Sequence, residues 1–376
     1  MSEKLISTLA SYVPALIKHR LLMDPTPITQ PTAEQFAAAV LFADISGFTA
    51  LTERLARRGP AGAEELTALL NTYFGQLIDL ITLHGGDIVK FAGDALIALW
   101  PVSDESEQSI QDHLAQAIHQ AARCGLEIQQ QLNEYEVAAR IHLSLKLTLC
   151  AGEVQSMHLG GVFNRWEFLV SGEPLVRVAK IADLVRPGDL VVTPEAWKLL
   201  EPVAHGTRFG DDSNPDNVAV IRLNSLSGNI PLLHTVDPPP EMPLETHPGL
   251  RAYIPGAIRT RLDAGQSGWL AELRRITVIF VNLPRLDYAI SVEQANTVMR
   301  TLQTVIYRYE GTVARFVDDE FLAFFGAPVA HEDDPVRAVH AALEILDTAV
   351  QGAATIRQEF DVDFQVRISL STGPVT

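Results

Sequence analysis

The sequence predicts an α+β fold built from two ferredoxin-like (split βαβ) domains in tandem, with the second domain incomplete at its C-terminal end. Three observations support this fold class. Hydrophobic patterns from residue 40 onward give the order strand, helix, hairpin, helix, strand, which is the ferredoxin-like order. The same patterns return from residue 275. The length of 376 residues, with 47% hydrophobic and 20% charged residues, suits a globular chain with two cores.

Residues 1–39 are expected to form an N-terminal helix and a connector. The apolar residues between positions 4 and 17 have helical spacing, and Lys18 and Arg20 follow them. Pro14 interrupts this segment, so we interpret it as a packing helix rather than a signal peptide. Prolines at positions 25, 27 and 31 then favour an extended connector.

A first domain is expected over residues 40–235. The continuous apolar run at 40–43 predicts a buried strand. The patterns then predict a helix at 52–83 interrupted near 59–62, a hairpin at 86–100, a helix at 109–136, an alternating strand at 142–150, a strand at 166–170, a helix from Glu173, and a strand at 189–194 that leads into a further helix. Residues 205–245 are rich in Pro, Asn, Asp and Gly, which is typical of a domain boundary.

After a linker at 236–274, a second domain is expected at 275–376 as a repeat of the first. Asn282 takes the place of Asp44 at the end of an apolar strand. Asp319 corresponds to Asp94 at an offset of 225 residues (319 − 94), and later segments match at a similar offset. Ordered matches of this kind indicate internal duplication. Nothing at the end of the sequence corresponds to residues 156–200, so we expect the second copy to be truncated.

Acidic residues at two strand ends form the candidate site. Asp44 follows the run at 40–43, and Asp94 lies at the turn of the hairpin. Taken alone, each is more typical of an ordinary turn residue. In a split βαβ arrangement the hairpin lies beside the first strand, and the two carboxylates would repel unless a cation neutralised them. Gly47 leads into a helix start with free amides, so the pattern favours two-metal phosphoryl or nucleotidyl transfer.

Charge and composition exclude several other classes of protein. A net charge of −17 argues against a nucleic-acid partner, which would need a basic surface. Cys124 and Cys150 are the only cysteines, so no disulfide framework or cysteine-based zinc site is expected. No run reaches the roughly 18 apolar residues of a membrane helix. We therefore expect a cytoplasmic protein without a membrane partner.

Two motifs carry a family resemblance, FADISGFT at 42–49 and KFAGD at 90–94. Both look like motifs of class III nucleotidyl cyclases, and the tandem order resembles the soluble, bicarbonate-responsive adenylyl cyclases. The resemblance covers nearly the whole chain. It implies an adenylate cyclase that converts ATP to 3′,5′-cyclic AMP and pyrophosphate at the interface of two cyclase domains, paired within one chain or in a homodimer.

The resemblance also assigns site residues. It implies two Mg²⁺ or Mn²⁺ ions as cofactors. Their ligands would be Asp44, Asp94 and the backbone carbonyl of Ile45, and the backbone amides of Gly47, Phe48 and Thr49 would contact the triphosphate.

The second copy departs from the family pattern. Arg315 stands where the family has a purine-reading Lys, which keeps the charge and favours ATP, since a Glu there would suit guanine better. The family's transition-state Asn and Arg belong to a helix beyond Gly373 that this sequence does not contain. An alternative is therefore a non-catalytic or regulatory nucleotide-binding module. A polymerase palm or a diguanylate cyclase is a third interpretation, but no Glu-Phe follows the Gly-Gly-Asp at 85–87.

A degenerate second pocket in such tandem cyclases resembles a bicarbonate site. Lys90 and Val170 match two of its three positions, and Arg177 and Lys180 are the cations nearest the third. Bicarbonate is thus an expected regulatory partner. Lys90 fits equally well as a solvated or salt-bridged lysine of the hairpin.

Overall fold

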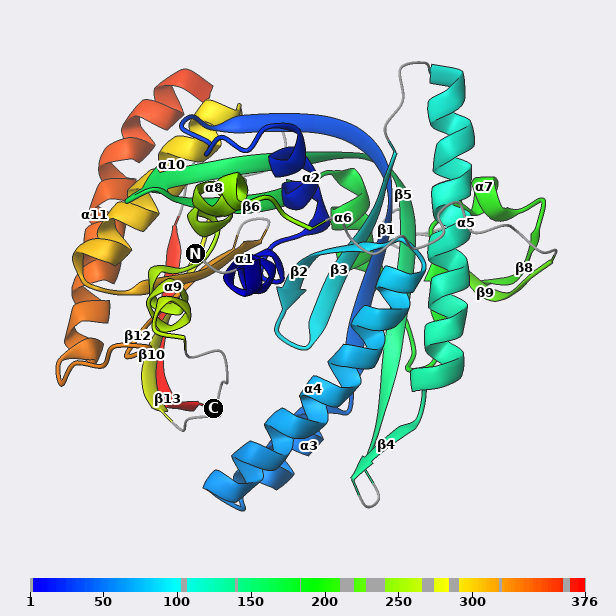
Figure 1. Cartoon of the computed structure of the whole chain (residues 1–376), viewed down its shortest axis with the longest axis horizontal. Coiled ribbons are helices and arrows are strands. Elements are labelled where there is room, and N and C mark those ends of the chain that lie inside the picture. The colour runs from blue at the N-terminus through cyan, green and yellow to red at the C-terminus, as the bar shows by residue number, and fades with distance from the viewer. Residues whose placement is uncertain are drawn as a thin grey trace.

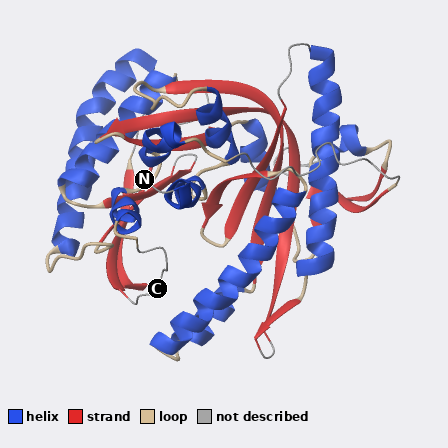
Figure 2. Cartoon of the chain, viewed as in Figure 1, coloured by secondary structure: helices blue, strands red, loops and turns tan. Residues whose placement is uncertain are grey.

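Two β-sheets joined by helices make up the structure, a computed structural model shown in Figures 1 and 2. It describes residues 3–102, 107–138, 141–182, 184–209, 220–227, 241–265, 274–283, 291–317, 320–360 and 366–375. We call the parts built on the larger and the smaller sheet the first and the second unit.

The first unit has strands in the order β2-β3-β1-β5-β7-β9-β8, and β4 and β6 pair with opposite ends of β5. Its two long central strands pair antiparallel over fifteen positions, from Thr32 opposite His158 to Ser46 opposite Ser144. The strands are β1 (Thr32–Ser46), β2 (Asp87–Ala92), β3 (Ala95–Val102), β4 (Tyr135–Ala138), β5 (Ile141–Val162), β6 (Arg165–Ser171), β7 (Leu190–Val192), β8 (Ala204–Phe209) and β9 (Val220–Leu226).

Helices cover both faces of this sheet because β1 is apolar on both sides. Leu41, Ala43 and Ile45 pack with the helices of one face, while Val40 and Phe42 belong to a separate cluster on the other. The first face carries α3 (Phe48–Ala56), α4 (Pro60–Leu83), α5 (Glu107–Leu132) and α7 (Pro194–Leu200). The second face carries α6 (Glu173–Ala182) and part of α2 (Ala15–Met23).

Several predicted elements are confirmed, including the hairpin, the helix broken near residues 59–62, and the helix that begins at Glu173. Two strand predictions were too short. β1 begins at Thr32 rather than Val40, inside the segment interpreted as a connector, and β5 continues to Val162 rather than ending at Cys150. The two extensions pair with each other, so each depends on a partner more than a hundred residues away and has no local signal. Strands β4, β8 and β9 were not predicted.

The second unit repeats the strand order of the first. Its sheet has the order β11-β12-β10-β13, which corresponds to β2-β3-β1-β5. Even the irregularity in the hairpin recurs, because a bulge lies between Ile88 and Lys90 and another between Val313 and Arg315. The elements are β10 (Arg274–Asn282), α10 (Val292–Arg308), β11 (Thr312–Val317), β12 (Glu320–Phe325), α11 (Asp334–Phe360) and β13 (Arg367–Val375).

The units meet where the far ends of β5 and β6 pack on α10. Met157, Leu159 and Leu169 of the first unit belong to the apolar core of the second. Polar contacts accompany them, since the Gly160 N–H donates to Oδ1 of Asn296 at 2.8 Å. Figure 1 shows β5 crossing the molecule to reach α10 and α11.

Helices from the N-terminal and linker segments form a cluster of their own beside this contact. Ile6, Leu9, Leu21 and Leu250 are buried there together with Trp166 of β6. The helices are α1 (Glu3–Ala10), α2, η1 (Leu244–Thr246), α8 (His247–Ala252) and α9 (Gly256–Asp263). Much of the expected linker at 236–274 is therefore packed structure rather than extended chain.

One described helix segment, Ala61–Leu83 of α4, is long and apolar enough to cross a membrane by length and composition alone. In the fold its Tyr73, Leu77 and Ile81 side chains are fully buried in the core beneath the first sheet. Tyr73 also donates a hydrogen bond from its hydroxyl to the Leu132 carbonyl at 3.0 Å. Core helices commonly pass a composition test of this kind.

Candidate active site

Asp44 lies near the carboxyl end of β1, on the sheet face opposite α4 and α5. It follows Val40 and Phe42 at intervals of two, so its side chain shares their face. On that face it stands opposite Lys146 of β5, and the Lys146 Nζ is 3.5 Å from the Asp44 Oδ2. Each side chain is 26% exposed, so the carboxylate is accessible and already lies next to one cation.

Asp94 is held beside Asp44 by the backbone. It occupies the turn between β2 and β3, and the Ile45 N–H donates to the Asp94 carbonyl at 3.2 Å. Asp44 itself pairs with Ala95, the residue after Asp94. The structure therefore brings the two predicted acids to one corner of the sheet, as the split βαβ arrangement requires.

Gly47 connects this corner to helix α3. Its φ of +95° lies in the left-handed region, and a Cβ there would be 2.8 Å from the His142 carbonyl oxygen. No side chain caps the helix that begins at Phe48. The first-turn N–H groups, which include those of Phe48 and Thr49, have no intrahelical acceptors and lie next to Asp44 in the chain.

Lys146 was missed by the sequence analysis. Its signal was present, because it is the charged residue on the polar side of the alternating strand at 142–150. Its importance depends on the β1–β5 register, which sequence alone does not specify.

The second unit holds the counterpart positions in the same register. Asn282 stands opposite Glu320 and Arg367, as Asp44 stands opposite Ala95 and Lys146. Asn282 is thus at the position predicted for it. The backbone of Arg315 lies at the bulge position of Lys90, while its side chain and Asp319 lie outside the described part of the chain.

The four candidate anion-site residues do not converge on one cavity. Lys90 lines a cavity of about 460 Å³ between the α1–α2 connection, β2 and β6. Arg177 lines a different cavity of about 320 Å³ and forms ion pairs with Glu173 and Glu195, which raise the pKa of Arg177. Val170 packs in the apolar cluster around Val40, and Lys180 is exposed on α6.

A largely buried carboxylate lines the first of these cavities together with Lys90. Glu167 of β6 lines the cavity, and burial raises its pKa even though Arg165 and Lys90 act in the opposite direction. The Arg165 Nη2 lies 3.2 Å from the Glu167 Oε2. The acid reduces the net positive charge available to an anion at Lys90, and no sequence signal had pointed to it.

The residues at the β1 corner fit a divalent cation by their chemistry. Asp44, Asp94 and the Ile45 carbonyl supply oxygen ligands, which Mg²⁺ and Mn²⁺ prefer. No group of three or more His, Cys, Asp or Glu residues with metal-site geometry occurs in the described ranges. A pair of carboxylates is what a magnesium site completed by water and substrate phosphates needs.

Comparison with known proteins decides the family. The family described as "Adenylate and Guanylate cyclase catalytic domain" matches residues 31–216, which contain this corner. The chain belongs to the class III nucleotidyl cyclases. The cyclase match begins one residue before β1, which agrees with the early start of that strand rather than with the boundary expected at Val40.

Curated relatives extend the likeness beyond the matched domain. The chain is 28% identical to "Adenylate cyclase type 10" of Oryctolagus cuniculus over 93% of its length, and 29% identical to the Homo sapiens protein of that name over 86%. It spans 23% and 21% of the length of these relatives. Among solved structures, the adenylyl cyclase CyaB from P. aeruginosa matches 53% of this chain and 100% of its own, at 20% identity and a TM-score of 0.43.

Proposed function

We propose that this cyclase converts ATP to 3′,5′-cyclic AMP and pyrophosphate. The observation that carries the proposal is the contact between the end of β1 and the β2–β3 hairpin. There the Ile45 N–H donates a hydrogen bond to the Asp94 carbonyl, next to Asp44 in the chain. Relatedness to adenylate cyclase type 10 over about nine-tenths of the chain supports ATP as the substrate. Arg315 at the base-reading position is consistent with that choice.

In the reaction, the ribose O3′ bonds to the α-phosphorus, the bond from the α-phosphorus to the bridging oxygen breaks so that pyrophosphate departs, and the O3′ proton passes to solvent water. Two Mg²⁺ or Mn²⁺ ions would lower the pKa of the O3′ hydroxyl and neutralise the departing pyrophosphate. Asp44, Asp94 and the Ile45 carbonyl would hold these ions, and the amides at Gly47, Phe48 and Thr49 would orient the triphosphate. Lys146 lies 3.5 Å from the Asp44 carboxylate and would balance its charge when no metal ion is bound.

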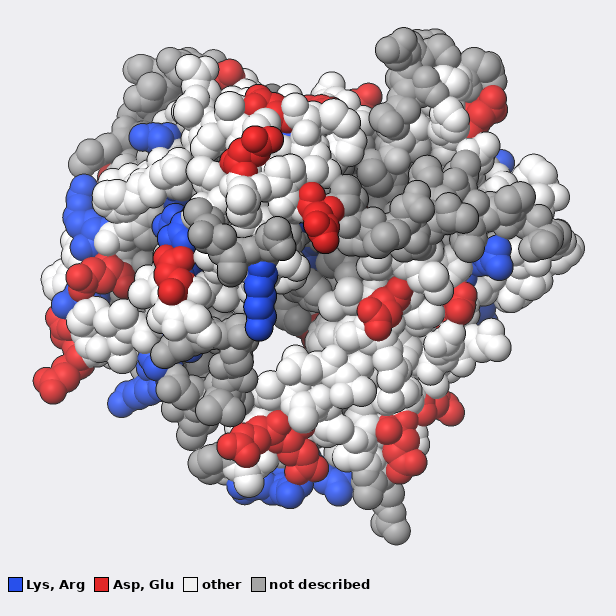
Figure 3. All heavy atoms as spheres, viewed as in Figure 1, with Lys and Arg blue, Asp and Glu red and all other residues white. Residues whose placement is uncertain are grey.

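The second unit would complete the site from the other side. We propose that residues 275–376 form part of a second cyclase domain that pairs with the first within one chain. Figure 3 shows an opening beside the position that the hairpin turn has in Figure 1, where substrate would enter. Asn282 in place of a second metal-binding Asp leaves one metal pair in the proposed site. The reaction is expected in the cytoplasm.

A second candidate function is nucleotide binding without turnover. Asn282 favours it, because an amide replaces a carboxylate at the second strand tip. Intact Asp44 and Asp94 favour catalysis instead. Regulation by bicarbonate at Lys90 stays a prediction. Because Glu167 lines the same cavity, bicarbonate would have to compete with the Glu167 carboxylate for the lysine.

The test is an assay of cyclic AMP and cyclic GMP formation with Mn²⁺. Asp44→Ala and Asp94→Ala should each abolish cyclic AMP formation, because each removes a metal ligand, while the unfolding temperature stays close to that of the wild type. Asp79→Ala, on the exposed side of α4, is the matched control and should retain activity. Full activity in both site variants would refute the site. ATP binding by a wild type that forms no cyclic nucleotide would establish the second candidate.

A further inference from the structure

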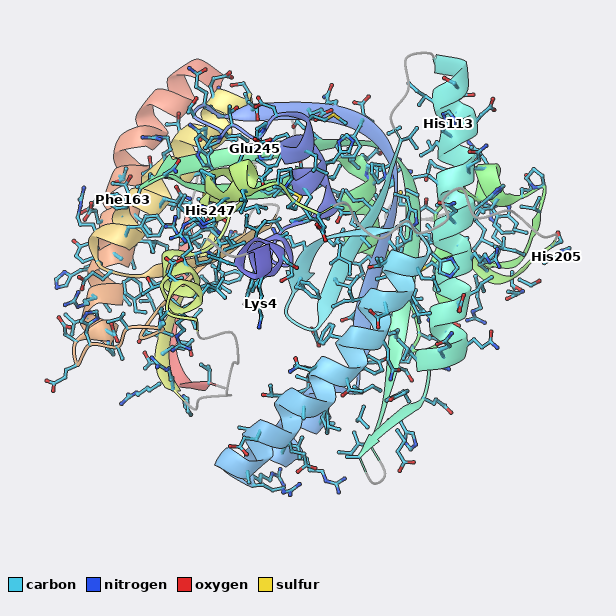
Figure 4. The ribbon with its side chains drawn as sticks, viewed as in Figure 1. Lys4, His113, Phe163, His205, Glu245 and His247 are labelled. Carbon is cyan, nitrogen blue, oxygen red and sulfur yellow. The ribbon has the colours of Figure 1, made fainter. Side chains whose placement is uncertain are left out.

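A separate cavity of about 290 Å³ lies where three parts of the chain meet. The turn between β5 and β6 forms one wall, the start of α9 a second, and the junction of α10 and β11 the third. The residues that matter here are Phe163, Arg165, Arg259, Tyr307 and Glu310. Figure 4 labels Phe163 at the end of the β5–β6 arm, beside α10 and α11.

Three arginines gather at this junction, although the chain as a whole carries a charge of −17. Two of them have acidic partners. Arg251 forms a two-point ion pair with Asp263 at 2.5 and 2.8 Å, and Arg165 binds Glu167. Within the described residues Arg259 forms no ion pair, and its Nη1 is 3.5 Å from the Arg251 carbonyl oxygen. Burial, with Arg251 and Arg165 nearby, lowers the pKa of Arg259, and the Asp263 carboxylate, which is paired with Arg251, offsets this only in part. A further negative charge would therefore stabilise the Arg259 guanidinium.

The acidic residue on the wall is already neutralised. Glu310 forms ion pairs with Arg337 and with His331, the latter at 3.2 Å. It therefore does not supply the charge that Arg259 lacks. The cavity keeps a net positive wall that an anion from outside can approach.

Aromatic rings form the mouth of the same cavity. Phe163 is 80% exposed and has a φ of 52°, which side-chain-bearing residues rarely adopt. Its ring centroid lies 6.1 Å from that of Tyr307, which comes from the other unit. The two ring planes are tilted by 39°, so the exposed Phe163 ring and its neighbour offer two apolar ring faces to a ligand.

We propose that this cavity binds a small aromatic acid, with its carboxylate or phosphate at Arg259 and its ring against Phe163 and Tyr307. A volume of about 290 Å³ lies at the small end for ligand pockets, which favours a single-ring acid over a nucleoside triphosphate. The guanidinium group suits either acid group, since it binds both through paired hydrogen bonds. This site is additional to the proposed nucleotide site.

The position of the cavity suggests what the ligand does. Its walls come from both units and the connecting helix, so an occupant holds them together. Arg165 in its wall binds Glu167, which lines the cavity that also contains Lys90 of the hairpin. An anion beside Arg165 competes with Glu167 and changes the charge next to that hairpin. The ligand would thus act as an effector.

The experiment is calorimetric titration of the full chain with phenyl phosphate and with benzoate. Two control ligands each lack one of the recognised groups. Inorganic phosphate lacks the ring, and benzyl alcohol lacks the charge. Arg259→Gln should weaken binding of at least one aromatic acid about tenfold, the usual loss for a hydrogen bond to a charged group. Phe163→Ala should weaken it as well, and because Phe163 is exposed this variant should fold normally.

Arg261→Gln is the matched control, since Arg261 lies on the same helix but lines the neighbouring cavity. It should bind the aromatic acids as the wild type does. Saturable binding of an aromatic acid that depends on Arg259 and Phe163 supports the proposal. Absence of saturable binding up to millimolar concentrations, equal affinity in Arg259→Gln, or an equal loss in Arg261→Gln would overturn it. If Arg259→Gln does not fold, Phe163→Ala and Arg259→Lys decide the result in its place.

Discussion

At the scale of single residues, Lys146 of the first unit lies opposite Asp44, a carboxylate of the candidate site. The pair of Asp44 and Lys146 partly neutralises a position that two acids share. A partly exposed pair of this kind is weak, so under the proposed function a divalent cation held by Asp44 and Asp94 would displace the lysine. The placement of the two acids at one corner was predictable, because each stands where a strand with apolar residues ends. Lys146 and Glu167 were not, because their roles depend on which strand lies beside theirs.

His158 carries a pH dependence that can be measured. Burial, with Arg20 nearby, lowers the pKa of His158 to about 4 from an ordinary 6.5. The Tyr253 hydroxyl and the His158 Nδ1 are hydrogen-bonded at 2.8 Å, which holds the ring in its buried position. The unfolded chain binds a proton near pH 6.5 and the folded chain only near pH 4. The stabilising contribution is therefore present above pH 6.5 and is lost as the pH falls towards 4.

We expect His158 to account for roughly 3 kcal/mol of the loss in unfolding free energy between pH 7 and 4. The measurement is urea unfolding at several pH values, for the wild type and for His158→Phe. The variant should lose less stability on acidification. Parallel pH curves for the two proteins would show that His158 does not titrate in this way.

At the scale of elements, the N-terminal helices are attached to the hairpin of the candidate site. Asp87 begins β2, and its carboxylate accepts hydrogen bonds from the N–H groups of Ala15 and Leu16 at 2.6 and 2.9 Å. It therefore caps α2 from a different part of the chain. The Gly-Gly-Asp at 85–87, which superficially resembled another enzyme family, has this structural role.

Asp87→Ala should release α1 and α2 from the hairpin. The change leaves two backbone N–H groups without acceptors and should cost about 1–3 kcal/mol of local stability. Hydrogen exchange of residues 3–23 should become faster, while exchange in α5 stays the same. Thr8→Ala, which removes only an exposed bond to the Lys4 carbonyl within α1, is the control. Unchanged exchange in α2 of Asp87→Ala would show that the cap does not hold the helix.

The same scale shows where sequence patterns stop predicting elements. The hairpin, α4 and α6 were predicted because their apolar spacing and glycines are local signals. The extensions of β1 and β5 stabilise each other across the sheet, and the polar stretch around residue 34 has no strand pattern of its own. The second half of β5 then reaches α10 and forms the contact between the units.

At the scale of the whole molecule, the two units share one strand order but differ at the strand tip, where the first has Asp44 and the second has Asn282. The registers of the two sheets match position by position, including the hairpin bulge. The duplication was visible in the sequence because residue types recur at a near-constant offset. The contact between the copies was not, because it depends on which residues of β5 and β6 reach α10. Met157 and Leu169 join the apolar core there, and Asn296 and Gln303 of α10 bind backbone groups of the two strands.

The central claim is that Asp44 and Asp94 together bind the divalent cations of a nucleoside triphosphate. It is tested most directly by measuring the affinity for Mn²⁺, by electron paramagnetic resonance, in the presence of a non-hydrolysable ATP analogue. Asn282→Ala changes the corresponding position of the second unit and is the matched control. We predict that Asp44→Asn and Asp94→Asn each weaken Mn²⁺ binding at least about tenfold, while Asn282→Ala does not. Equal Mn²⁺ affinity in the wild type and both Asp variants would contradict the account.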